Sequence, residues 1–139
     1  ATLQSGAPFT VNLGQDVANI GSGPAQRPDQ IGDPTLPASQ RSPEQWFNTA
    51  AFTLQDPFTF GSALRNSVFA PGMAVVDLSI QKDWPVGQDG RFEVRWDVFN
   101  LLNRANFDVP NRIFGTPNFG RIFSAQHARE MQLGLRYTF

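Results

Sequence analysis

The one histidine of the chain, His127, is followed by Glu130 three residues later. An imidazole beside a carboxylate can act as a general base or hold a metal ion, but either role needs further groups that converge on the same point. The neighbouring sequence supplies none. Because the chain has no cysteine, it also has no thiolate nucleophile and no cysteine ligand for zinc. We therefore predict no catalytic residue and no metal site.

Other residue types that could do chemistry lack the setting that the chemistry requires. The serines show no nucleophile elbow; those considered are Ser42, Ser62, Ser67 and Ser124. The stretch GSGPAQ at 21–26 lacks the third glycine and the strand-to-helix context of a dinucleotide loop. The acidic residues at 16, 29, 33 and 56 are too dispersed for a calcium loop. The protein is predicted to be no enzyme and to carry no cofactor.

Charge and length limit the partners. Eleven Lys and Arg against twelve Asp and Glu give a net charge of -1, so no basic field is present to hold a phosphate backbone, and nucleic acid is not expected as a partner. The 139 residues fit one domain. No stretch approaches the roughly 20 apolar residues of a membrane-spanning helix, whereas membrane-spanning strands are shorter and merely alternate.

The first half of the chain has the composition of a long loop. Residues 1–72 hold 7 of the 12 Gly and 8 of the 11 Pro, but only 8 of the 23 charged residues. Proline every few residues prevents a helix or a central strand. We predict a weak strand over 1–13 and then a long irregular loop over 14–72, of the kind that outer-membrane barrels carry on their outer face.

The second half alternates apolar and polar residues, as strands do. Strands are predicted over 73–86, 91–103 and 127–139, and an Asp89-Gly90 pair marks a short hairpin connection at 87–90. Only Lys82 breaks the alternation of the first strand. In the second, the apolar set is interleaved with Arg91, Glu93, Arg95 and Asp97. Residues 104–126 are again rich in Asn, Pro and Gly, which predicts a second long connection.

Two environments produce such strands. In a soluble sandwich the apolar faces meet a second sheet, whereas in an outer-membrane barrel they meet lipid and the polar faces line the lumen. Ionic polar faces, strand lengths near the 9 to 11 residues that cross the hydrocarbon, and connections that alternate long, short, long favour the barrel. The predicted fold class is all-β, an antiparallel meander of about four strands from a transmembrane β-barrel. The odd residues from Arg91 to Asp97 are predicted to face the lumen.

Several segments, in order, resemble one known family. They are SGAPFTV at 5–11, RPDQIGDP at 27–34, QWFNTAAF at 45–52, FGSALRN at 60–66, VDLSIQKDW at 76–84, FNLLNRANFDVP at 99–110, FGRI at 119–122 and the terminal REMQLGLRYTF. The ordered set is similar to the C-terminal segment of a TonB-dependent outer-membrane receptor of the Oar-like, carboxypeptidase-regulatory-like type. One small departure is FAPGM at 69–73, where relatives often have Gly before the Pro.

The resemblance implies a structural role in the bacterial outer membrane. Such receptors have roughly 22 strands, a plug and a TonB-interacting segment near the N-terminus, so transport is not expected of this segment alone. The implied partners are outer-membrane lipid, upstream barrel strands and the barrel-assembly machinery. The resemblance also implies an assembly signal at Leu135, Tyr137 and Phe139, although Phe139 could instead simply complete an apolar strand face.

Two further alternatives stay open. The loop aromatics Trp46, Phe47 and Phe52 could form a ligand-facing surface or the small core of the loop. Trp84 could lie in the aromatic girdle of a barrel or against a buried sheet. The alternative function is a released extracellular module that self-assembles as a homo-oligomer or polymer, because a four-stranded piece leaves two unpaired edges.

Overall fold

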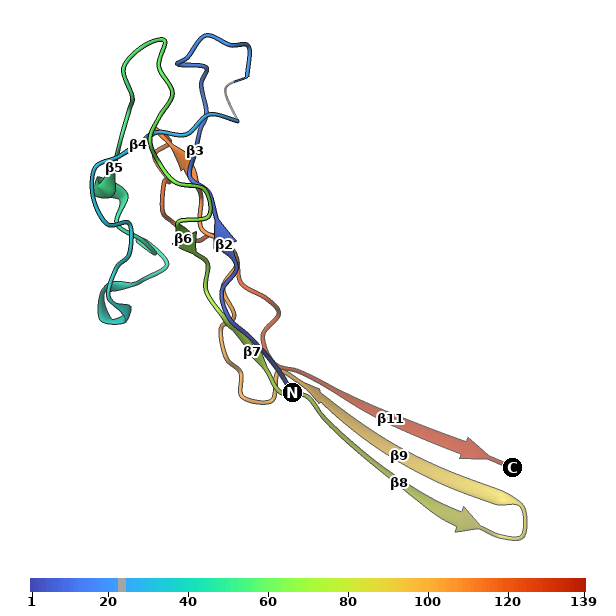
Figure 1. Ribbon diagram of the computed structural model, residues 1–139. Helices are drawn as coiled ribbons and strands as arrows, with labels where there is room; N and C mark the ends of the chain where they lie inside the picture. Colours follow the sequence, from blue (N-terminus) through green and yellow to red (C-terminus); the bar gives the residue numbers. More distant parts are fainter. Residues whose placement is uncertain (23–24) are drawn as a thin grey trace. The chain divides into compact units, whose positions relative to one another are not determined.

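The computed structural model describes residues 1–22 and 25–139, and the chain divides into two compact units. The sheet unit comprises Ala1–Gln4, Met73–Asn106 and Ala125–Phe139; the loop unit comprises Ser5–Gly72 and Phe107–Ser124. The fold is all-β and the long strand pairs are antiparallel, although the barrel is not closed (Figure 1). Residues 23–24 of the GSGPAQ stretch lie outside the described residues.

The sheet unit is built on three long strands, β8 (Leu78–Val86), β9 (Gly90–Phe99) and β11 (Glu130–Thr138). They lie side by side in the order β11-β9-β8, and both pairs are antiparallel (Figure 1). Alternation of apolar and polar residues in all three strands gives the sheet two chemically different faces. β8 and β11 lie within the predicted ranges 73–86 and 127–139, and β9 begins one residue before the predicted range 91–103.

The strands end where the backbone leaves the extended region. The hairpin connection is Gly87–Asp89, with Gly87 at φ 71°, and a Cβ on Gly90 would lie 2.3 Å from the carbonyl oxygen of Val86. Strand β9 ends at Phe99 rather than at the predicted residue 103, because Asn100 adopts φ 50° and Asn103 φ 48°. Asparagine tolerates this left-handed conformation better than most residues.

The predicted strand 73–86 is interrupted. Its first part forms β7 (Met73–Val75), which pairs antiparallel with β1 (Thr2–Gln4), and β8 begins after a break at residues 76–77. Two contacts to the end of β9 hold the break: the Leu101 N–H donates to the Val76 carbonyl at 2.7 Å, and the Asn100 N–H donates to Asp77 Oδ1 at 2.9 Å. A side-chain acceptor here replaces a regular ladder bond.

The strand predicted over 1–13 is not continuous, because β1 is followed by two separate two-residue strands. The described residues of the loop unit form six two-residue strands in all. Their bounds are β2 (Pro8–Phe9), β3 (Asn12–Leu13), β4 (Asp29–Gln30), β5 (Phe52–Thr53), β6 (Val68–Phe69) and β10 (Ile113–Phe114). Pairs β2-β6 and β4-β5 are antiparallel, and β10-β3 is parallel. Two short 3₁₀ turns, η2 (Ala38–Gln40) and η3 (Thr49–Ala51), lie between β4 and β5.

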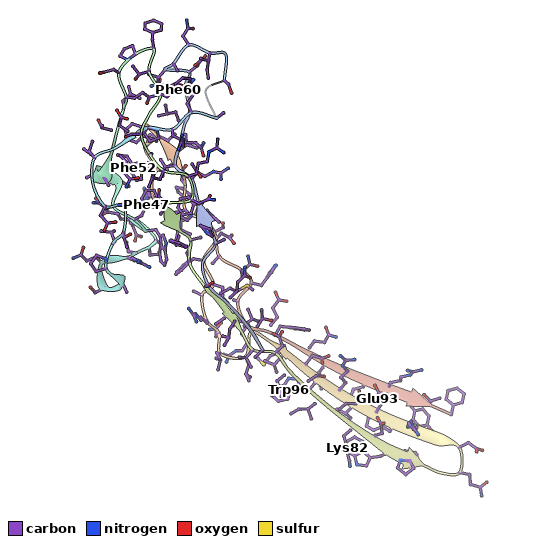
Figure 2. All side chains as sticks on the ribbon, in the orientation of Figure 1. Phe47, Phe52, Phe60, Lys82, Glu93 and Trp96 are labelled. Carbon is purple, nitrogen blue, oxygen red and sulfur yellow. The ribbon has the colours of Figure 1, made fainter. Side chains whose placement is uncertain are left out.

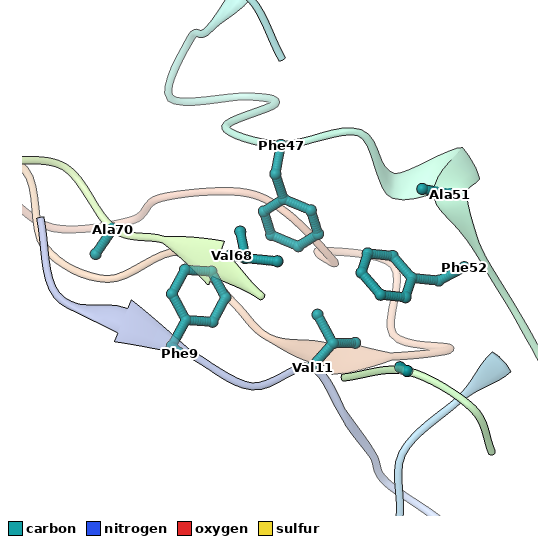
Figure 3. Close-up of a cluster of buried hydrophobic side chains, with 8 residues drawn as sticks. Phe9, Val11, Phe47, Ala51, Phe52, Val68 and Ala70 are labelled. Atoms are coloured by element: carbon teal, nitrogen blue, oxygen red, sulfur yellow. The ribbon is translucent and has the colours of Figure 1, made fainter. Parts of the chain in front are cut away.

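A hydrophobic cluster holds the loop unit together (Figure 3). Its centre is Phe47, 1% exposed, whose ring meets those of Phe9, Phe52 and Phe119 edge to face, with centroids 5.1 to 6.1 Å apart. The smaller buried members are Val11, Ala51, Ala63, Val68 and Ala70. Edge-to-face aromatic pairs add to the stabilisation from apolar burial. A segment with little regular secondary structure thus has a core of its own.

Candidate functional site

The three-stranded sheet carries one continuous apolar face. Strand register puts the apolar residues in four cross-strand rows: Leu78–Val98–Met131, Ile80–Trp96–Leu133, Lys82–Val94–Leu135 and Trp84–Phe92–Tyr137. Residues in one row lie within side-chain contact distance. Lys82 is the one charged member, and its long stem can lie along the apolar surface while the ammonium reaches water. We refer to these rows as the apolar face.

Much of this apolar face is uncovered (Figure 2). On β11, Met131, Leu133 and Leu135 are 63%, 67% and 65% exposed, and Trp96 of the central strand is 41% exposed. A soluble monomer rarely leaves so large an apolar patch open, so such a patch marks an interaction with lipid or protein. The sandwich alternative needs a second sheet over this face, and no residue of the described sheet unit supplies one.

The row next to the hairpin turn is entirely aromatic. Trp84 and Phe92 have ring centroids 6.1 Å apart, and Tyr137 lies opposite Phe92 in the register. Rings of this kind form the girdles of membrane barrels at the water interface. Sequence reasoning identified Trp84 alone; the three-residue row becomes visible only once the strands are paired.

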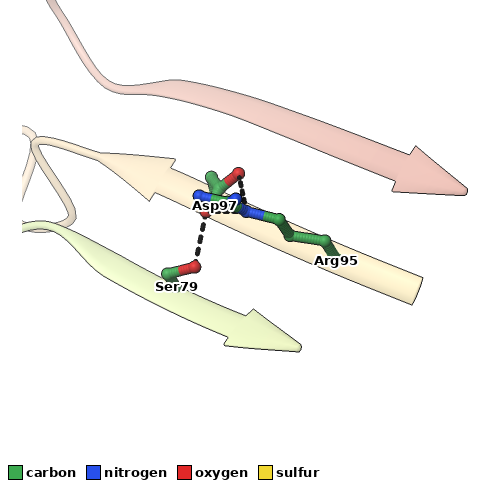
Figure 4. Close-up of polar contacts among 3 residues, drawn as sticks. All are labelled: Ser79, Arg95 and Asp97. Atoms are coloured by element: carbon green, nitrogen blue, oxygen red, sulfur yellow. Dashed lines mark hydrogen bonds and ion pairs between the residues drawn. The ribbon is translucent and has the colours of Figure 1, made fainter. Parts of the chain in front are cut away.

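The opposite face is polar and is organised around Asp97, which is 4% exposed (Figure 4). Ser79 on β8 donates its hydroxyl to Asp97 Oδ1 at 2.6 Å, and Arg95 Nε donates to both carboxylate oxygens at 3.0 and 2.8 Å. A buried carboxylate requires such compensation. The contact between Ser79 and Asp97 also ties two neighbouring strands together.

All four residues predicted to face the lumen lie on this polar face. Arg91 and Arg95 are exposed, Glu93 is half-buried and Asp97 is buried. Across the strands, Glu93 has Asp83 on one side and Arg136 on the other. Charged rows of this kind suit a wet lumen.

Leu135 and Tyr137 lie on the apolar face of β11, and Phe139 follows the last paired residue. Phe139 is 95% exposed, and its ring stacks on that of Tyr137 at a centroid distance of 6.0 Å. The three residues therefore form an exposed apolar series along one edge strand. This geometry is compatible with recognition by another protein and equally with completion of a strand face.

The loop aromatics do not form a ligand surface as a group. Phe47 and Phe52 are buried in the core cluster of the loop unit, so neither ring is available to a ligand. Trp46 is half-buried; its indole N–H donates to the Phe69 carbonyl at 2.9 Å, and the Arg41 guanidinium lies 5.7 Å from its ring. Of the two roles considered for these residues, the structure shows packing within the loop.

His127 and Glu130 form a solvent-exposed pair, with Nδ1 and Oε1 3.5 Å apart. They line a pocket of about 300 Å³ in the sheet unit together with Asp77. The Asp77 carboxylate accepts a hydrogen bond from the Asn100 backbone N–H and so stabilises the turn after β9. Among residues 1–22 and 25–139, no cluster of three or more His, Cys, Asp or Glu side chains is suited to a metal ion.

Two buried asparagines were missed by sequence reasoning. Asn106, 2% exposed, accepts the Ala74 N–H at 2.8 Å; Asn100, 5% exposed, donates to the carbonyls of Arg104 and His127 at 3.0 and 3.1 Å. They join β7, the turn after β9 and the segment before β11. Asn106 lies in the Asn-rich stretch 104–126 that predicts a connection, whereas Asn100 lies within the strand predicted over 91–103, and neither pattern signals a buried side chain.

No helix among the described residues has the length and hydropathy to cross a membrane. The sheet unit is an antiparallel sheet with one apolar face, one charged face and an aromatic row next to the turn. These are the features of strands from outer-membrane β-barrels. Residues 1–132 match the family described as the outer membrane beta barrel domain. The chain belongs to this family, and its location is the bacterial outer membrane. No curated protein and no solved structure matches the chain.

Proposed function

We propose that the chain is the C-terminal barrel segment of a TonB-dependent outer-membrane receptor, with the loop unit on the outer side. In this role the apolar face meets lipid and the polar face lines the lumen. The observation that carries the proposal is the uncovered apolar face opposite a charged face with a compensated buried carboxylate. The role is structural, since transport needs the rest of the barrel and its plug.

The edges of the sheet support a place within a larger barrel. Among the described residues, β8 and β11 each pair only with β9, so each has one open edge. Closing a barrel removes such edges. β1 pairs with β7 in an antiparallel register, Thr2 opposite Val75, and a strand preceding Thr2 would continue along the open edge of β8. Upstream barrel strands are therefore the proposed partners of that edge.

In the proposed placement, the Gly87–Asp89 turn is periplasmic. Strand β8 then runs inward, β9 outward and β11 inward, and the row of Trp84, Phe92 and Tyr137 lies in the periplasmic aromatic girdle. Leu135, Tyr137 and Phe139 are the proposed contact for the barrel-assembly machinery. Phe139→Ala is expected to lower the amount of folded barrel in the outer membrane without changing expression, and Thr138→Ala serves as the matched control.

The receptor assignment is tested by its dependence on TonB. The full-length protein, purified from outer membranes, is titrated with the periplasmic domain of TonB and binding is measured by calorimetry. Saturable binding by the full-length protein, and none by the 139-residue chain alone, is the expected result. A correctly inserted full-length protein that does not bind the domain would contradict the TonB-dependent assignment and leave a different kind of outer-membrane barrel.

The open edges also favour a second candidate, a released module that assembles through edge pairing. Light scattering after size exclusion of the 139-residue chain, in buffer without detergent, distinguishes the two. A soluble oligomer of defined mass would support self-assembly with the apolar faces buried between copies. Insolubility relieved by detergent or by upstream strands would support the receptor segment.

A further inference from the structure

Three arginines of the loop unit surround one surface pocket of about 400 Å³. Arg27, Arg65 and Arg112 line it, together with Thr10, Asn12, Ala25 and Asn66. We refer to it as the arginine pocket. All seven residues belong to the loop unit but come from four separate stretches of the chain. Three guanidinium groups at one pocket form a concentrated positive site.

Backbone contacts hold these stretches in place. The Leu13 N–H donates to the Gln26 carbonyl at 2.9 Å, which sets the segment containing Arg27 against β3. The Asn12 N–H donates to the Arg112 carbonyl at 3.0 Å, at the start of the parallel β10-β3 pair. These contacts fix the backbone positions from which Arg27 and Arg112 extend.

The Arg65 side of the pocket is fixed by Asn66, which adopts φ 55°. Its N–H donates to Thr10 Oγ1 at 2.9 Å, and the Thr10 hydroxyl donates to Asn66 Oδ1 at 3.2 Å. The guanidinium of Arg27 donates to the Ala63 carbonyl, two residues before Arg65. Arg27 is thereby half-buried and oriented, whereas Arg65 and Arg112 are exposed.

The positive charge is not neutralised by the described residues. None of the three guanidinium groups has an Asp or Glu oxygen within 4.0 Å among residues 1–22 and 25–139. Yet the loop unit is not basic as a whole, because its five arginines are matched by six acidic residues. Asp29 accepts the Ser62 N–H at 2.8 Å and Asp33 accepts the Thr35 N–H at 2.8 Å, so both carboxylates serve the backbone instead.

An apolar pocket of about 180 Å³ adjoins the arginine pocket and shares Ala25, Arg27 and Arg65 with it. Its other walls include Ile20 and Phe60, which are 54% and 73% exposed; Phe60 is labelled in Figure 2. A ligand that spans both pockets would place an anionic group among the arginines and an apolar group against the Phe60 ring. Exposed aromatic side chains commonly serve such contacts.

We propose that the arginine pocket binds the phosphate of a phosphate monoester whose apolar part lies against Phe60 and Ile20. Guanidinium groups bind phosphate oxygens in bidentate geometry, and a doubly charged phosphate suits a site with three of them better than a singly charged carboxylate does. The phosphate comes from a soluble ester or from a lipid headgroup. This binding function goes beyond the barrel role and does not depend on TonB.

The test uses the full-length protein reconstituted in phosphatidylcholine nanodiscs at about 0.15 M salt, where exposed charges outside the site are screened. Phenyl phosphate and inorganic phosphate are titrated by calorimetry, and phenyl phosphate is expected to bind more tightly because of the apolar pocket. Vesicles of phosphatidylcholine, with and without phosphatidic acid, are added as competitors. Competition by phosphatidic acid alone would assign the lipid source; binding without competition would assign the soluble source. Either result supports the site.

The variants are Arg65→Gln and Arg112→Gln, both at exposed positions where folding should be preserved. Each is expected to weaken phenyl phosphate binding about tenfold, as expected for the loss of a charge-assisted hydrogen bond. Arg121→Gln removes a charge of the loop unit that lines neither pocket and should leave affinity within about twofold, because this side chain makes no charge-assisted hydrogen bond to a phosphate held there. Phe60→Ala should remove the preference for phenyl phosphate over inorganic phosphate.

The proposal is overturned if none of the three probes binds, or if Arg121→Gln weakens binding as much as the two pocket variants do. The second result would indicate general electrostatic attraction rather than a site. Because binding is measured without TonB, failure here leaves the receptor proposal intact, and failure to bind TonB leaves the pocket intact.

Discussion

Leu133 on β11 lies directly opposite Trp96 on β9, and the two side chains are 67% and 41% exposed. Paired apolar side chains normally gain stability from mutual burial. Here the pair remains open to the surroundings, as do Met131 and Leu135 on the same face. No residue of the described sheet unit covers the apolar face, and lipid is its proposed partner.

Leu133→Arg should impair assembly of the protein in the membrane. On a lipid face near the midplane, an arginine costs about 2 to 4 kcal/mol, because a charge replaces an apolar group in hydrocarbon. The measurement is the amount of folded protein in the outer membrane, together with its unfolding free energy in lipid vesicles. Gln132→Arg is the matched control, since Gln132 pairs with Asp97 on the polar face. Equal effects of the two variants would argue against the assigned faces.

Asp97→Ala should destabilise the barrel by about 1 to 3 kcal/mol, because Ser79 and Arg95 then lose their shared acceptor. Denaturant unfolding in vesicles measures the loss. Asp83→Ala, at an exposed position on the same face, should have an effect below about 0.5 kcal/mol. A double-mutant cycle with Arg95→Ala separates the direct pair energy from the cost of an unpaired partner. A coupling energy near zero would mean that Arg95 does not stabilise Asp97.

Phe47→Ala should loosen the loop unit while leaving the strands of the sheet intact. Removing a buried phenylalanine typically costs about 3 to 5 kcal/mol through lost burial and the remaining cavity. Limited proteolysis of the variant in outer membranes should then cleave within 5–72, a segment that should resist cleavage in the wild type. Phe58→Ala is the control, because Phe58 is 75% exposed, and this variant should be cleaved at the same rate as the wild type. Unchanged resistance of Phe47→Ala would show that the cluster does not hold the loop.

Asp16 should make the 16–21 turn sensitive to acid. The Ile20 N–H hydrogen bond, followed by those of Gly21 and Gln26, lowers the pKa of Asp16 below its ordinary value of 3.8. A carboxylate with a lowered pKa stabilises the fold above the unfolded value, and this contribution is lost as the pH falls through the folded pKa. Carboxyl-carbon NMR should give a pKa below 3.8 for Asp16, and the protection of the Ile20 and Gly21 amides relative to their intrinsic exchange rates should be lost below that pKa. Asp16→Asn should abolish that pH dependence. A measured Asp16 pKa at or above 3.8 would contradict the stabilising role of these hydrogen bonds.

The long strands could be predicted because their signal is local. Alternation along 78–86, 90–99 and 130–138 fixes which side chains share a face, whatever the partner strand. Their ends were less predictable. Whether Asn100 continues a strand or turns depends on acceptors contributed by Asp77 and by the His127 carbonyl, which are distant in the sequence.

The loop unit and the arginine pocket were not predictable in the same way. The two-residue strands have no period to detect, and the parallel pairing of Ile113 with Asn12 joins residues about a hundred positions apart. Arg27, Arg65 and Arg112 share no spacing, so only the folded loop shows that they meet. For the loop aromatics the sequence left both a core and a ligand-facing surface open, because composition alone does not specify burial.

The most direct test of the central claim, that the apolar face meets lipid, uses single spin labels. This chain has no cysteine, so Leu133→Cys and Gln132→Cys place labels on adjacent residues of opposite faces. In the full-length protein in vesicles, the label at 133 should collide with dissolved oxygen and be shielded from a water-soluble nickel relaxant, and the label at 132 should not show this lipid pattern. Equal access of the nickel relaxant to both labels would contradict the account.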